Sequence, residues 1–85
     1  MKNLITEYEI AKRESDAAEN AMLENPENAE LETAFDNAYK KEFDSFVNLA
    51  NGIKEITNGK ISFETAKIMI NTRFAEIKNL IALYQ

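Results

Sequence analysis

Histidine and cysteine are both absent from this sequence of 85 residues. The side chains that most often supply a base at physiological pH, a thiol nucleophile or a soft metal ligand are therefore missing. Without cysteine the chain has no disulfide framework, which is typical of intracellular proteins. Its first twelve residues, MKNLITEYEIAK, lack the apolar segment of a signal peptide, and we expect a cytoplasmic location.

Glycine and proline are also scarce, with two residues and one residue, which argues against a turn-rich β fold. Each glycine follows an asparagine singly, so the sequence contains no glycine-rich phosphate loop. No segment approaches the roughly 18 apolar residues of a membrane span, and none matches a calcium loop or a nucleophile elbow. We therefore predict a protein that is not an enzyme, binds no cofactor or metal and has no membrane segment.

Apolar residues recur at three- and four-residue steps along most of the chain, which is the spacing of amphipathic helices. Three such segments, at about residues 3–24, 26–58 and 62–84, are joined by short links that favour antiparallel neighbours. At about 1.5 Å per residue the middle helix would span about 45 Å. The predicted fold is all-α, a single domain over residues 1–85 that forms an elongated antiparallel three-helix bundle with a long central helix.

The central helix has clear end signals. Asn25 is a suitable N-cap, Pro26 suits the first helical position, and Asn58-Gly59 supplies a left-handed stop. Apolar residues cover more than one stripe of this helix, which predicts a partner on each side. We expect the helix to continue through Gly52, where an interior glycine costs about 1 kcal/mol relative to alanine and a kink would form most easily.

Core packing is expected to differ between the two helix pairs. The first helix has small side chains in its middle, which should face aromatic residues of the central helix. The expected pairs are Ala11 with Phe43, Ser15 with Tyr39 and Ala18 with Phe35. The third helix, N-capped by Ser62, has the most regular apolar face. Its expected contacts with the central helix are Ile70 with Ala50, Phe74 with Phe46 and Ile77 with Phe43. This second hairpin should hold most of the stability, and the first helix is the weaker partner.

Glu42 lies near the middle of the apolar face of the central helix, between Ala38 and Phe46. A buried carboxylate must be paired or protonated. We expect Glu42 to reach Lys12, Lys78 or a tyrosine hydroxyl and to fix the register of the helices, which is a structural role.

The net charge of −5 is distributed unevenly. No basic residue occurs between Arg13 and Lys40, so we expect no direct binding of nucleic acid there. All the acidic residues of that stretch are candidate partner-binding residues: Glu14, Asp16, Glu19, Glu24, Glu27, Glu30, Glu32 and Asp36. We call them the acidic set.

These features favour a non-enzymatic protein-binding module, an acidic inhibitor or adaptor that docks on a basic surface such as the nucleic-acid groove of a larger protein. Small phage-encoded inhibitors, including anti-CRISPR proteins and DNA mimics, share these properties, a likeness of type and not of motif. The alternative is a structural or assembly protein that acts through helix–helix self-association as a homo-oligomer. Eight lysines against two arginines, with nine isoleucines and ten asparagines, are typical of a low-GC genome.

Overall fold

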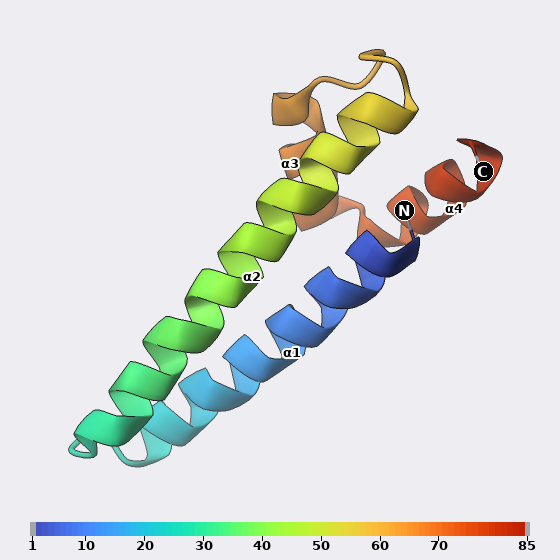
Figure 1. The fold of residues 1–85 in the computed structure, drawn as a ribbon. Coiled ribbons are helices and arrows are strands. Elements are labelled where there is room, and N and C mark those ends of the chain that lie inside the picture. The colour runs from blue at the N-terminus through green and yellow to red at the C-terminus, as the bar shows by residue number, and fades with distance from the viewer. Residues whose placement is uncertain (1, 85) are drawn as a thin grey trace.

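A computed structural model describes residues 2–84, which form four helices (Figure 1). The helices are α1 (Lys2–Glu24), α2 (Ala29–Ile56), α3 (Phe63–Thr72) and α4 (Phe74–Tyr84). Helices α1 and α2 form a long antiparallel pair, α3 lies beside the C-terminal half of α2, and α4 turns toward the start of α1 (Figure 1). The all-α prediction is confirmed, and Met1 and Gln85 of the predicted domain lie outside the described residues.

The molecule is elongated, as predicted. Its principal extents are 47 × 20 × 18 Å and its radius of gyration is 14.8 Å, whereas a compact chain of this length would have a radius of about 12 Å. Helix α2 is the longest element, with 28 residues, and it packs against each of the other three. Its central place in the fold therefore agrees with the sequence.

The predicted third helix is wrong, because the chain breaks at Arg73 into α3 and α4 and the bundle has four helices. The backbone of Arg73 has φ −140° and ψ 46°, outside the helical region. Asn71 and Thr72, which precede it, are among the weaker helix formers. The Arg73 N–H donates to the Met69 carbonyl at 2.7 Å and closes α3, while the Arg73 carbonyl accepts from the Glu76 N–H at 3.0 Å and opens α4.

After the break, α4 keeps a contact with α2 and its first residues also reach α1. The ring centroid of Phe74 lies 5.5 Å from that of Tyr8, and Lys78 Nζ lies 3.3 Å from a carboxylate oxygen of Glu9. These contacts tie the start of α4 to the N-terminal half of α1. As a result α4 does not continue along α2, and the N-terminal half of α2 has only α1 as a neighbour (Figure 1).

The core occupies the end of the molecule where all four helices meet. Its buried members are Ile5, Tyr8, Leu49, Ala50, Ile53, Ala66, Ile70, Ile77 and Ile81. Ile70 and Ala50 share this core, and the rings of Phe46 and Phe74 both approach the ring of Tyr8. The predicted contact between Ile77 and Phe43 is wrong, because Ile77 is buried whereas Phe43 is 54% exposed.

Helix α2 begins later than predicted. The Asn28 N–H donates to the Asn25 carbonyl at 3.1 Å, which closes a turn with Pro26 in its second position, where proline is favoured. Asn28 is the N-cap, and its side-chain oxygen accepts from the Glu30 N–H at 3.0 Å. Asn25 instead ends α1, with its N–H donating to the Ala21 carbonyl at 3.2 Å.

The predicted stop of α2 is confirmed, since Asn58 and Gly59 have φ of 54° and 80°. The buried residue Thr57 fastens this end of the helix: its hydroxyl donates to the Ile53 carbonyl at 2.8 Å and accepts from the Ile61 N–H at 3.2 Å. Helix α2 runs without interruption through Gly52. Ser62 is the N-cap of α3, as predicted, and accepts from the Thr65 N–H.

The predicted pairing of small with aromatic residues is only partly right. Ala11 and Ser15 are buried, but Tyr39 and Phe43 are 52% and 54% exposed. No residue from 16 to 48 is buried. We call this part of the α1–α2 hairpin the arm, and the rest of the described chain the core end.

Candidate functional site: the acidic arm

Each residue of the acidic set is exposed. Seven of them lie in the arm, and Glu14 precedes it by two residues. All three ion pairs between described residues lie at the core end: Lys67 with Glu64, Arg73 with Glu76 and Lys78 with Glu9. The acidic set therefore offers its carboxylates to solvent without a basic partner among residues 2–84.

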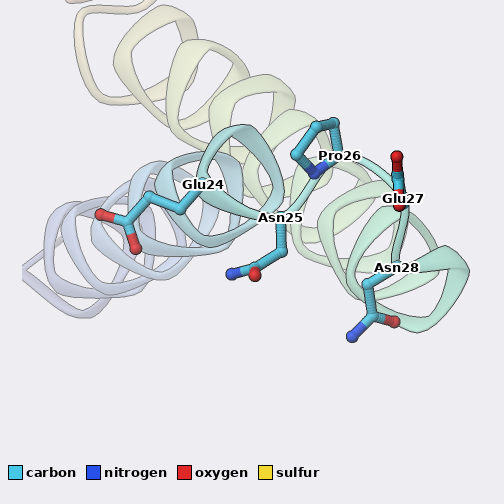
Figure 2. Close-up of a pocket in the computed structure, with 5 residues that line it drawn as sticks. All are labelled: Glu24, Asn25, Pro26, Glu27 and Asn28. Carbon is cyan, nitrogen blue, oxygen red and sulfur yellow. The ribbon is translucent and has the colours of Figure 1, made fainter.

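The tip of the arm is the turn between α1 and α2. A shallow hollow of about 450 Å³ is lined by Glu24, Asn25, Pro26, Glu27 and Asn28. Figure 2 shows their side chains spreading in different directions from the backbone. No two of them converge on a common point, so the tip presents separate charges and not an enclosed binding pocket.

Helix dipoles act differently on the carboxylates at this tip. Glu30 and Glu32 lie in the first turn of α2, where negative charge is stabilising. Glu24 is the last residue of α1, whose final turn contains no basic residue, and negative charge is unfavourable there. At least one member of the acidic set thus opposes the stability of its own helix.

The structure divides the acidic set between faces of the α1–α2 pair. Asp16 lines a hollow of about 450 Å³ together with residues of α1, α3 and α4: Tyr8, Glu9, Lys12, Arg13, Ile70, Asn71 and Phe74. Glu14 lines a different hollow of about 320 Å³, formed by α1 and α2 alone and shared with Lys41 and Asp44. Sequence reasoning treated these carboxylates as one surface, whereas only the face of Asp16 adjoins α3 and α4.

Tyr8 lies where the core end meets the arm. It is 6% exposed, and its ring lies between those of Phe46 and Phe74. Burial raises the pKa of Tyr8 above its ordinary value of 10.0, and the negative charges of Glu42 and Asp16 raise the pKa further. Glu42 is half-buried and acts on Tyr8 through its charge, while its expected pairing with a lysine or a tyrosine hydroxyl stays a prediction.

Two exposed aromatic residues were assigned to the core by the sequence pattern. Tyr39 and Phe43 line a hollow of about 400 Å³ with Lys40 and Asp44, all four from α2. The ring centroid of Tyr39 is 6.1 Å from that of Phe35. The signal that could have revealed the exposure of Phe43 is the weak helical sequence Asn71-Thr72-Arg73, because the segment after it was expected to cover Phe43 through Ile77.

Among residues 2–84 the structure offers neither a metal-binding cluster nor a helix that could span a membrane. The fold does not bring together three or more acidic residues in an arrangement that could hold a metal ion. No helix of the described chain is long and apolar enough to cross a membrane. Comparison with protein-family models, curated proteins and solved structures finds no match to this chain.

Proposed function

We propose that this protein is a non-enzymatic protein-binding module that docks its acidic arm on a basic surface of a larger protein. The observation that carries the proposal is the separation of charge. Between Arg13 and Lys40 the chain has eight acidic and no basic residues, and these carboxylates are exposed while the ion pairs lie elsewhere. Unpaired surface charges of one sign steer a partner of opposite charge and fix its orientation.

A basic surface is typical of proteins that bind nucleic acid. An inhibitor or adaptor of this type would occupy the nucleic-acid groove, in the manner of small acidic phage-encoded proteins such as anti-CRISPR proteins and DNA mimics. The elongated arm suits such a role, because a narrow hairpin with charges on more than one face can enter a groove.

The test is capture from a lysate of the source organism at low salt. The immobilised protein is compared with a variant in which every member of the acidic set is changed to glutamine or asparagine. We expect the parent to retain a basic protein that is released as salt increases, because screening weakens charge contacts. The affinity of the purified partner for both proteins is then measured. Equal affinity of the neutralised variant at low salt would rule out docking through these carboxylates.

Self-association is the second candidate function. Ile68 and Leu83 are 62% and 82% exposed at the core end, and Ile10 is 46% exposed on α1. Apolar side chains of this kind can form a seam between copies. Size-exclusion chromatography with light scattering separates the two functions: an oligomer that persists on dilution supports assembly, and a monomer supports the docking module.

A further inference from the structure

The face of α2 that receives α3 continues into the arm and is open there. Residues seven apart in a helix are two turns apart and point in nearly the same direction. Two such rows run along this face: Glu32, Tyr39, Phe46 and Ile53, and Asp36, Phe43, Ala50 and Thr57. Ile53, Ala50 and Thr57 are fully buried, whereas Tyr39 and Phe43 are more than half exposed.

Helix α3 accounts for the change along these rows. Ala66 and Ile70 share the core with Ala50 and Ile53, and α3 ends at Thr72, where Asn71 and Asp16 at the start of the arm line one hollow. Since α4 then turns onto α1, no further element covers the rows (Figure 1). The exposed part of these two rows directly continues the surface of α2 on which α3 packs.

Helix α1 forms the second side of this open face. Asp16 lines the hollow in which α3 ends and α4 begins, so it lies on the same side of the hairpin as those helices. Glu19 follows three residues later and projects from the same side of α1. We define the open face by Asp16 and Glu19 of α1 and by Glu32, Asp36, Tyr39 and Phe43 of α2. It has an aromatic centre and carboxylates on both helices. Basic side chains border it, because Lys40 lines the hollow of Tyr39 and Phe43, and Lys12 and Arg13 line that of Asp16.

Within the molecule, one lysine of α4 makes a charge contact with this side of α1, and it also contacts an aromatic ring of its own helix. Lys78 of α4 pairs with Glu9 at 3.3 Å, and its ammonium nitrogen lies 5.7 Å from the ring centroid of Phe74. A lysine here contacts a carboxylate and an aromatic ring together, which combines charge pairing with a cation–π contact. Glu9 precedes Asp16 by seven residues, so the same row of α1 continues onto the open face.

We propose that the open face binds a basic amphipathic helix of a partner protein. This helix would lie along α2, in line with α3. The apolar side of that helix would cover Tyr39 and Phe43, and its lysines or arginines would meet the carboxylates of both arm helices. The distance along α2 from Glu32 to Phe43 corresponds to about three helical turns. A symmetric contact with a second copy would instead place carboxylates against carboxylates. This inference rests on the proposed function and specifies the partner surface.

The probe is a fluorescein-labelled peptide of 18 residues that contains only leucine and lysine, with leucine at helical spacing. A control peptide has the same composition, reordered so that no helical stripe remains. Fluorescence anisotropy measures the affinity of both peptides for the full chain. We expect the helical peptide to bind at least 10-fold more tightly, because only it can present an apolar stripe and basic flanks together.

Matched variants locate the binding face. One replaces the four carboxylates of the open face, D16N/E19Q/E32Q/D36N, and the other replaces the remaining members of the acidic set, E14Q/E24Q/E27Q/E30Q. Both remove four charges. We expect the first to weaken binding of the helical peptide at least 10-fold and the second by less than 3-fold. The variant Y39S/F43S should also lose at least 10-fold, and thermal melts check that it is folded.

The outcomes separate the inference from the proposed function. If both peptides bind with equal affinity and the two charge variants lower that affinity equally, the arm attracts basic partners but the open face is not a binding site for a helix. If neither peptide binds at low salt, the inference and the proposed function both fail. If light scattering shows a dimer that Y39S/F43S abolishes, a second copy occupies the face and the inference is overturned. Binding of the helical peptide with losses confined to the open-face variants supports it.

Discussion

Leu31 and Leu49 lie in the same helix, α2, yet they belong to different regions of the molecule. Leu49 is fully buried at the core end, where four helices meet. Leu31 is only half-buried in the arm, where α1 is the one neighbour. The comparison shows that one helix serves two purposes. At the core end its apolar side chains are buried and stabilise the fold, and in the arm its carboxylates are exposed and unpaired.

The difference has an energetic consequence. A chain of 85 residues buries too little apolar surface to have a wide stability margin. Its surface of 5818 Å² exceeds the roughly 5100 Å² expected for a compact protein of this mass. An arm with no buried residue contributes little to stability, and a partner that covers it would stabilise the folded protein by mass action.

The largest expected effect comes from the two leucines. Leu49→Ala should destabilise the protein by about 2 to 5 kcal/mol, because it leaves a cavity in the core. Leu31→Ala should cost less than about 1.5 kcal/mol, because its side chain is only partly buried and no cluster of buried residues surrounds it. Urea unfolding of both variants measures the difference. Equal losses would show that the arm is packed as well as the core end.

A smaller effect is expected for the phenylalanines. Phe46 and Phe74 are half-buried against Tyr8, so substitution of either by alanine should cost about 2 to 3 kcal/mol. Phe43→Ala is the matched control and should cost less than about 1 kcal/mol, since its side chain is 54% exposed. Thermal melts rank the three variants, and a loss at Phe43 as large as at Phe46 would contradict the open face.

Removing charge from the arm should leave stability equal or higher. Glu24 opposes the dipole of α1, and Glu32 and Asp36 form a like-charge pair four residues apart. The variant E19Q/E24Q/D36N keeps Glu32, whose charge is stabilising in the first turn of α2, and should therefore melt at the same temperature or up to about 5 °C higher. A melting temperature lower by several degrees would mean that these carboxylates stabilise the fold and are not kept unpaired for binding a partner.

The smallest effect concerns Tyr8 at the boundary of the two regions. Its pKa is raised in the folded protein above the value of 10.0 that applies when it is unfolded. The neutral form is therefore stabilised by folding, and this contribution is complete below pH 10 and is lost as the pH rises through the folded pKa. Urea unfolding from pH 8 to above pH 10 should show a loss of stability that Tyr8→Phe reduces. If Tyr8→Phe loses as much stability at high pH as the parent protein, the loss comes from other titrating groups.

Sequence reasoning worked where a local rule decides the structure. The periodicity predicted α1 and most of α2, Ser62 was correctly assigned as a cap, and Asn58-Gly59 stops α2. Asn25 was misassigned because Pro26 suits a turn as well as a helix start, and the hydrogen bond from Asn28 selects the turn. At the start of α2, the sequence signals for a turn and for a helix N-terminus are similar in strength and compete.

The break at Arg73 could not be predicted in the same way, because the apolar spacing of residues 62–84 fits one helix. Tertiary contacts decide it, since α4 gains the ring of Tyr8 and the carboxylate of Glu9 by turning onto α1. Because of that bend, Phe43 lacks its expected cover from Ile77. The acidic set was found from the sequence, but its division between faces needed the structure.

Hydrogen exchange along α2 tests the two-region description most directly, because one helix passes through both regions. In the free protein we expect the amides of residues 31–41 to exchange at least 10-fold faster than those of residues 49–56, through local opening of the arm. Added helical leucine–lysine peptide should slow exchange at residues 31–41 and leave residues 49–56 unchanged. Uniform protection along α2 in the free protein would contradict the claim that the arm is an open, weakly stabilised region.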